Sequence, residues 1–246
     1  MPVFTDFETR SAADLKAVGL ANYAEHPTTD LWCVCYAHDD GPVRTWRPGD
    51  PVPVFAHLDD PVVAHNAAFE HAIWNAVLAP RYGWPALPVE RVICTMARSY
   101  AMGLPGGLDG AAGALGLKHR KDKEGHALML RMARPRSKAG VTPIVWWDDA
   151  ERIARLIAYC ETDVVVERDI YRATLPLGDA ETTLYRLDRR VNERGIPFDR
   201  VSVEAALAAA DMARRDLDSQ MAELTGGAVG SCSALAALKD WLHSLG

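Results

Sequence analysis

The segment VFTDFET at residues 3–9 combines β-branched and aromatic residues with two acids, and it predicts a β-strand close to the start of the chain. Side chains alternate across a strand, so Asp6 and Glu8 point to the same face. Two neighbouring carboxylates repel each other unless a cation lies between them, and Mg²⁺ or Mn²⁺ is the usual cation for such oxygen ligands. Two solvent-facing acids on an edge strand are the simpler alternative, and this segment alone leaves both interpretations open.

The composition is that of an ordinary globular protein, with 246 residues of which 49% are hydrophobic and 24% charged. There is no apolar run of about 18 residues, and the acids at positions 6 and 8 interrupt any apolar signal sequence, so we expect neither a membrane span nor a signal peptide. The five cysteines form no CxxC pair, which favours buried thiols and a cytoplasmic location. The net charge of −6 argues against a protein that coats DNA independently of sequence. It is compatible with an enzyme that binds only the end of a strand.

A third acid follows a short apolar strand predicted at 62–64. Asn66 is expected to cap a helix over residues 67–78, and Glu70 lies four residues later, in its first turn. A carboxylate in the first turn is favoured by the helix dipole. This stabilisation alone would also explain an acid at position 70, without any role in a site. Because open α/β sheets place their sites just beyond the ends of internal strands, Glu70 is a candidate site residue.

A fourth acid lies on a long helix that Asp148 or Asp149 is expected to cap and that runs to about residue 172. Tyr159 and Asp163 are four residues apart and therefore share one face of this helix. A tyrosine at the edge of the hydrophobic core is the alternative interpretation of Tyr159.

A basic block between residues 118 and 138 stands out in an acidic chain, and it could steer a phosphate backbone. A solvated surface is the commoner meaning of such a run. The cations of this block are Lys118, Arg120, Lys121, Lys123, Arg131, Arg134, Arg136 and Lys138.

The remaining patterns predict further strands and helices of an α/β protein. Strands are expected at 31–38, 43–47 and 89–94, and the first two form an antiparallel meander with segment 3–9 around a turn at 39–42. Helices are expected at 12–18, 51–58, 95–101, 108–115 and 180–194, from Asp199 or Ser202 to about 224, and at 234–245.

The four acids, in this order and context, resemble the DEDD superfamily of 3′–5′ exonucleases, which has a ribonuclease H-like fold. The three motifs are DFET at 6–9, HNAAFE at 65–70 and YCETD at 159–163. The tyrosine of the last motif is similar to that of the subgroup containing the proofreading domains of DNA polymerases and RNase D-like enzymes. Glu70 departs from the family pattern, which has aspartate there, and it extends the carboxylate by about one methylene.

Longer segments resemble the N-terminal part of phage-type family A DNA polymerases: DFETRSAADL (6–15), VAHNAAFEHAIW (63–74), LIAYCETDV (156–164) and VNERGIPFD (191–199). The resemblance implies a mixed five-stranded sheet flanked by helices, in an exonuclease domain at 1–177. It also implies that residues 178–246 are a helical lead-in to a polymerase part that would be a partner absent from this chain. No polymerase activity is then expected from this chain alone.

The resemblance implies that two divalent cations, Mg²⁺ or Mn²⁺, bind to Asp6, Glu8, Glu70 and Asp163. Asp6 would bridge the ions, and Tyr159 would orient the attacking water. Thr9 and Asn66 would contact the terminal nucleotide. The substrate would be a single-stranded or frayed 3′ end of DNA, shortened by release of nucleoside 5′-monophosphates.

Two alternatives remain beside a proofreading exonuclease. One is an RNase D-like 3′–5′ exoribonuclease, although the tail from about residue 180 lacks the character of an RNA-binding helical module. The other is an inactive nuclease fold that serves as a nucleic-acid-binding or structural module.

Overall fold

The computed structural model describes residues 1–137 and 142–246, so Lys138 of the predicted basic block lies outside the described residues. The chain forms two compact units, Met1–Arg194 and Gly195–Gly246. The first unit includes helix α8 (Asp179–Arg194). The predicted functional boundary at residue 177 is a different division, and it stays a prediction.

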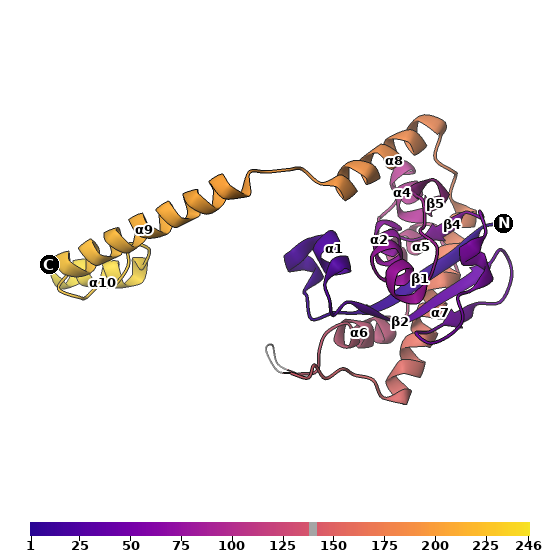
Figure 1. Ribbon diagram of the computed structural model, residues 1–246, viewed down its shortest axis with the longest axis horizontal. Coiled ribbons are helices and arrows are strands. Elements are labelled where there is room, and N and C mark those ends of the chain that lie inside the picture. The colour runs from indigo at the N-terminus through magenta and orange to yellow at the C-terminus, as the bar shows by residue number, and fades with distance from the viewer. Residues whose placement is uncertain (138–141) are drawn as a thin grey trace. The chain divides into compact units, whose positions relative to one another are not determined.

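A mixed five-stranded sheet forms the centre of the first unit (Figure 1). The strand order is β3-β2-β1-β4-β5, with β2 antiparallel to β1 and β3, and β4 parallel to β1 and β5. The strands are β1 Val3–Arg10, β2 Asp30–His38, β3 Arg44–Trp46, β4 Val62–Ala64 and β5 Val92–Cys94. The predicted α/β class and the antiparallel meander are confirmed, and the arrangement is consistent with a ribonuclease H-like fold.

Helices cover both faces of this sheet. The helices of the first unit are α1 Leu15–Glu25, η1 Val54–His57, α2 Ala68–Ile73, η2 Trp74–Leu78, α3 Ala79–Tyr82, η3 Val89–Arg91, α4 Thr95–Ala101, α5 Leu108–Ala114, α6 Lys123–Met132, α7 Ala150–Ala173 and α8. The long helix α7 starts as expected, because the side chain of Asp149 accepts a hydrogen bond from the Arg152 backbone N–H at 3.1 Å.

The two faces of β1 lie against different cores. On one face, small residues and thiols fill the space under α7: Phe4, Cys33, Cys35, Ala37, Val63, Cys160 and Val164. On the other face, Phe7 stacks on Trp74 with ring centroids 6.3 Å apart, and Trp74 meets Trp84 edge-on at 4.7 Å. Strand alternation therefore sends Phe7 into an aromatic core and its neighbours Asp6 and Glu8 toward α7.

The helix predicted over residues 67–78 is present as α2 and η2, from Ala68 to Leu78, but the prediction that Asn66 caps it is wrong. Helix α2 begins at Ala68, and Ala67 before it makes no side-chain cap hydrogen bond. Asn66 has φ 66°, in the left-handed region that asparagine tolerates, whereas a capping residue needs an extended backbone. Its carbonyl instead accepts a hydrogen bond from the Phe69 N–H at 2.9 Å, which closes a turn before the helix. A π-helical segment, Trp74–Leu78, then replaces the regular end of the expected helix.

Two other expected elements are displaced. The helix expected at 12–18 is α1, which starts at Leu15 because Asp14 caps it by accepting from the Lys16 N–H at 2.9 Å. Of the strand expected at 89–94, only the last three residues form a strand, β5, because the neighbouring strand β4 has only three residues with which to pair. Residues before β5 form the 3₁₀ turn η3 instead.

The segment expected to be helical at 51–58 forms only the 3₁₀ helix η1. Proline occupies three positions of residues 51–61 (51, 53 and 61), and each lacks the backbone N–H that a regular helix uses. The inward side of η1 is nevertheless buried, at Phe55 and Ala56.

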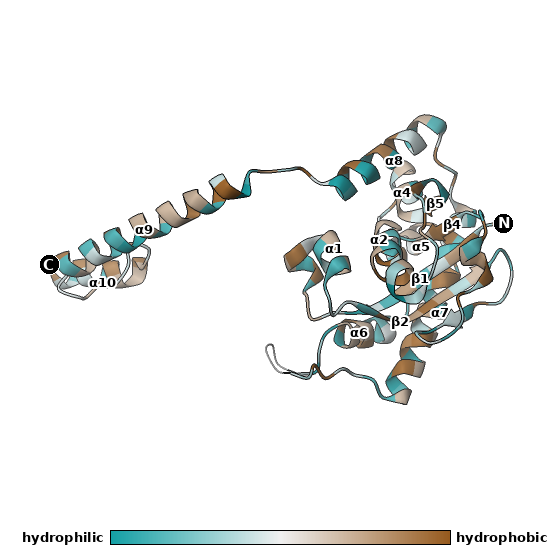
Figure 2. Ribbon diagram, viewed as in Figure 1, coloured by the Kyte–Doolittle hydropathy of each residue, from teal (hydrophilic) through white to brown (hydrophobic). Residues whose placement is uncertain are grey.

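The second unit contains α9 (Arg200–Leu224) and α10 (Leu235–Ser244). Asp199 caps α9, as predicted, by accepting from the Ser202 N–H at 3.1 Å. Figure 2 shows hydrophobic residues interspersed with hydrophilic ones along α9. Within residues 1–137 and 142–246, no helix combines the length and apolarity that crossing a membrane requires.

Candidate active site

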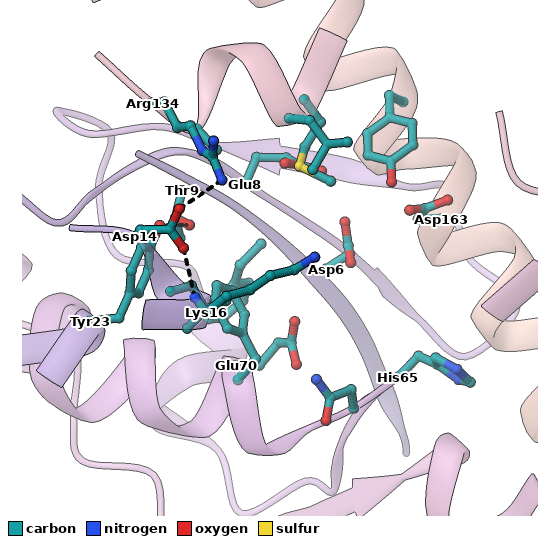
Figure 3. A pocket seen from close by; sticks show the side chains of 18 of the residues that line it. Asp6, Glu8, Thr9, Asp14, Lys16, Tyr23, His65, Glu70, Arg134 and Asp163 are labelled. Atoms are coloured by element: carbon teal, nitrogen blue, oxygen red, sulfur yellow. Dashed lines mark hydrogen bonds and ion pairs between the residues drawn. The ribbon is translucent and has the colours of Figure 1, made fainter. Parts of the chain in front are cut away.

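All four predicted acids line one cavity of about 360 Å³. They come from three elements: Asp6 and Glu8 from β1, Glu70 from α2 and Asp163 from α7. In Figure 3 the carboxylates of Asp6, Glu70 and Asp163 point toward the same space. The fold therefore brings together acids that lie far apart in the sequence.

The position of Asp6 and Glu8 follows from the register of the sheet and the docking of α7. Asp6 pairs with Cys35 on β2, and Glu8 pairs with Cys33. The Cys160 thiol on α7 donates a hydrogen bond to the backbone carbonyl of Asp6 at 3.2 Å. One carboxylate oxygen each from Asp6 and Glu8 lies within 4.8 Å of the Cys160 sulfur. This contact fixes α7 against the acidic end of β1.

Glu70 is placed by the end of β4 and the turn that follows it. The ring of His65 is held at both nitrogens: Nδ1 lies 2.9 Å from Thr95 Oγ1, and Nε2 lies 2.8 Å from the Gly106 carbonyl oxygen. His65 therefore ties the strand end to two neighbouring segments. The turn at Asn66 then starts α2, and Glu70 is buried in its first turn, beside Asp6.

The electrostatics of the cavity favour a bound cation. Burial, and then the negative charge of Asp163, raise the pKa of Asp6 to about 8. Burial, and then the charge of Asp6, raise the pKa of Glu8 and of Glu70 well above the usual range. Glu70 Oε2 and Asp163 Oδ1 are buried and lack a hydrogen-bond partner among the described residues. Such carboxylates are costly to keep ionised unless a positive charge compensates them.

Tyr159 lies beside these acids, one turn before Asp163. Its hydroxyl is 3.4 Å from His126 Nδ1, and its side chain is almost fully buried. Burial, and then the charge of Asp163, raise the pKa of the Tyr159 phenol. The phenol therefore stays protonated near neutral pH. Helix α6 packs closely on this ring because Gly125 has no side chain: a Cβ there would lie 2.6 Å from Tyr159 Cδ2.

The predicted nucleotide contacts, Thr9 and Asn66, also line the cavity. The Thr9 hydroxyl is hydrogen-bonded to the Tyr23 hydroxyl at 2.9 Å, and both groups are buried. Asn66 is exposed. Asn66 is therefore open to a ligand, whereas Thr9 would have to share or exchange its hydrogen bond with Tyr23.

Positive side chains lie around the same cavity. Lys16 and Arg134 line it, and Arg134 forms an ion pair with Asp14 at 2.9 Å, next to the Asp14–Lys16 cap (Figure 3). From the predicted basic block, Lys121 and Arg134 line the cavity, whereas Arg120 pairs with Asp109 at 2.9 Å. Part of the basic block therefore lies where a phosphate group could approach the acids.

Two residues near the acids were not predicted as site residues. Lys121 forms an ion pair with Asp163, with Nζ 3.0 Å from Oδ2. Glu167 is 1% exposed, and burial, followed by the charges of Asp6 and Glu70, raises its pKa well above the usual range. The spacing of four residues between Asp163 and Glu167 is a sequence signal that both face the same side of α7. No comparable sequence signal pointed to the contact between Lys121 and Asp163.

The donor set of the cavity fits a hard divalent cation. Mg²⁺ and Mn²⁺ prefer carboxylate oxygens, and the cavity offers the four predicted acids besides Asp14, which pairs with Arg134. Two of the predicted acids carry a buried oxygen without a partner among the described residues. Below them, Cys33, Cys35 and Cys160 have sulfur atoms within 4.8 Å of one another and are fully buried. Cys35 and Cys160 also lie within hydrogen-bond distance of backbone carbonyls, as expected of buried thiols that fill a core.

Comparison with known proteins gives a relative for nearly the whole chain. The chain is 33% identical to a DNA polymerase of Bacillus phage SP02, over an alignment that covers 98% of this chain. It spans 38% of the length of that polymerase. No protein-family model matches the chain.

Proposed function

We propose that this chain is a metal-dependent 3′–5′ exonuclease that removes nucleotides from DNA ends and releases nucleoside 5′-monophosphates. The observation that carries this proposal is the convergence of Asp6, Glu8, Glu70 and Asp163 in one cavity beside Tyr159. The similarity to a phage DNA polymerase supports DNA as the substrate. We assign residues 1–177 to the nuclease and residues 178–246 to a lead-in that joins a polymerase part outside this chain.

The four acids would hold two divalent cations, Mg²⁺ or Mn²⁺. When bound, such ions lower the pKa of water and offset negative charge on the phosphate. The four carboxylate charges equal the four positive charges of two divalent ions, so the loaded site would be neutral. This balance also supports ionisation of acids whose pKa values burial raises.

The other residues of the cavity would bind and orient the reactants. Tyr159 is kept protonated by burial and would donate a hydrogen bond that orients the attacking water. Asn66 and Thr9 would contact the terminal nucleotide from the side of β1 and β4. Lys16 and Arg134 would attract the phosphate backbone at the mouth.

The proposal is tested with a 5′-labelled primer that carries a 3′ mismatch on its template, incubated with Mg²⁺, with Mn²⁺ or with EDTA. The expected result is stepwise, metal-dependent shortening from the 3′ end. Asp6→Ala should lower the rate roughly a thousandfold or more, because it removes a carboxylate shared by the whole site. Asp148→Ala changes an exposed acid ahead of α7 and should cleave like the wild-type protein.

Matched RNA and DNA oligonucleotides separate the remaining alternatives. Trimming of RNA without cleavage of DNA would contradict DNA as the substrate and support an RNase D-like enzyme. A folded protein that shortens neither substrate with either metal would contradict the enzyme and support a binding module.

A further inference from the structure

Lys121 is a positively charged side chain inside the acidic cavity. It lies in the connection between α5 and α6, with Nζ 3.0 Å from Asp163 Oδ2 and 5.2 Å from the centroid of the Tyr159 ring. Its side chain is 24% exposed, and that of Asp163 is 5% exposed. This is therefore an ion pair that is largely shielded from water, not a surface contact.

We infer that, in the metal-free protein, the Lys121 ammonium group occupies the position at Asp163 that a divalent metal ion would take. It is displaced when the metal binds. The inference rests on the proposed metal site. The ammonium group pairs with Asp163 Oδ2, and Oδ1 has no partner among the described residues. A metal ion on this carboxylate and the ammonium group beside it would repel each other strongly in a shielded cavity.

The charge of Lys121 acts on the whole acid cluster. It opposes the effect of burial on the pKa of Asp163, and it does the same, as a smaller contribution, at Asp6 and Glu8. Four carboxylates around one ammonium leave excess negative charge, which attracts a divalent ion. Two bound divalent ions would balance the four carboxylates by themselves, so Lys121 would then be surplus positive charge.

A second cavity beside Lys121 offers space for the displaced amine. Lys121 also lines this cavity of about 350 Å³, whose other lining residues include Gly107, Leu108 and His126. The lysine stem has four flexible carbons, so the amine can turn toward this cavity without movement of the helices. It would remain close to Asp163 and could pair with a substrate phosphate. Lys121 would then be a positioning residue that leaves the metal site and serves the substrate.

The affinity of the protein for Mn²⁺, measured by electron paramagnetic resonance without nucleic acid, tests this inference. Lys121→Met keeps an unbranched, flexible side chain that is one atom shorter, and it removes the charge. We expect this variant to bind Mn²⁺ roughly three- to tenfold more tightly than wild type, because the competing cation is gone. At saturating Mn²⁺ its cleavage of DNA should be slower. The matched control is Lys118→Met, which changes an exposed lysine of the same connection and should alter neither quantity.

The outcomes separate this inference from the proposed function. If the wild-type protein binds Mn²⁺ and Lys121→Met binds it equally or more weakly, the displacement is wrong and the metal site stands. If the wild-type protein binds no Mn²⁺, the proposed metal site fails and the inference fails with it. A purely structural role of Lys121 would weaken metal binding and cleavage together, so tighter binding with slower cleavage distinguishes displacement from support.

A second measurement uses the wild-type protein alone, in case Lys121→Met does not fold. Acetylation by acetic anhydride, followed by mass spectrometry, reports how accessible each lysine amine is. Lys121 should be acetylated faster with Mn²⁺ than with EDTA, while Lys118 reacts at the same rate in both. An unchanged or slower reaction of Lys121 with Mn²⁺ would overturn the inference.

Discussion

Burial stabilises one face of β1 and destabilises the charged groups on the other face. On one face, Phe7 packs against Trp74, and the apolar surface removed from water stabilises the fold by about 25 cal/mol per Å². On the other face, burial of Asp6 and Glu8 raises their pKa values and disfavours their charged forms. Residues next to each other in one strand thus contribute to stability with opposite sign.

This difference shows how one strand can supply both a core and a reactive site. Because side chains alternate with a period of two, a register shift by one residue would exchange the two faces and bury the acids in the aromatic core. The pairing of Asp6 with Cys35 and of Glu8 with Cys33 fixes that register. The aromatic face can then compensate for repulsion between carboxylates on the face under α7.

The largest expected effect concerns the aromatic face. Trp74 is fully buried and contacts Phe7, Phe55 and Trp84. Trp74→Ala should lower the free energy of unfolding by about 3–5 kcal/mol, because it removes a large apolar side chain and leaves a cavity. Urea unfolding followed by circular dichroism in EDTA measures this loss. The control is Trp147→Ala, a partly exposed residue outside this core, and an equal loss in both variants would contradict the assigned importance of the aromatic face.

The acidic face should make the metal-free protein sensitive to pH. The pKa of Asp6 is 3.8 in its unperturbed state and about 8 in the fold, so the folded state binds more protons between these values. Stability therefore falls as pH rises through this window. In EDTA we expect a loss of roughly 1–3 kcal/mol between pH 5 and pH 8, after allowance for solvent screening.

Two changes should flatten this pH dependence. Asp6→Asn removes one of the titrating acids and leaves Glu8 and Glu70, so it should weaken the pH dependence, and saturating Mn²⁺ supplies positive charge to all of them. Thermal unfolding at several pH values measures both effects. Stability that rises from pH 5 to pH 8 in EDTA would show that the acids are not buried in this way.

A smaller effect is expected where α6 meets Tyr159. In Gly125→Ala the added methyl would lie 2.6 Å from Tyr159 Cδ2 and 2.8 Å from its Cβ, so α6 or the ring must move. Overpacking of this kind costs about 1–3 kcal/mol of unfolding free energy, and the shifted phenol should also slow cleavage. The matched control is Gly230→Ala, where an added Cβ meets no atom within 4 Å. Wild-type cleavage by Gly125→Ala would argue against a precise position for Tyr159.

The smallest expected effect concerns Glu167, which we distinguish from Asp163, the other buried acid of α7. Asp163 lines the cavity and pairs with Lys121, whereas burial keeps Glu167 protonated. A glutamine resembles a protonated glutamate in shape, so Glu167→Gln should change the free energy of unfolding at pH 7 by less than about 1 kcal/mol. Its rate of cleavage should stay within tenfold of wild type. Asp163→Asn should abolish cleavage, and a comparable loss in Glu167→Gln would show that Glu167 acts as an ionised ligand.

Much of the fold was predictable because its signals are local. The alternation of segment 3–9 predicted a strand with two acids on one face, and strand β1 spans that segment. The aspartates that begin α7 and α9 were predicted as caps, and both accept the expected backbone hydrogen bonds. The predicted acids also line one cavity, although their part in metal binding and catalysis stays a prediction.

Asn66 shows where local reasoning failed. Its residue type and its place before a helical pattern fit a cap, yet its backbone is left-handed and its carbonyl closes a turn. Asparagine suits both roles, so residue type could not distinguish them. The hydrogen bonds of His65 with distant residues fix the strand end beside it.

The sequence by itself determined most of the strands and helices, the face of β1 that carries Asp6 and Glu8, and the shared face of Tyr159 and Asp163. These follow from the fixed periods of strands and helices, which any short segment contains. Only the tertiary structure decided that Lys121 reaches Asp163 and that Glu167 is buried beside Asp6 and Glu70. Contacts of this kind depend on how separate elements pack, and burial then sets the charge of each group in a way that no local pattern encodes.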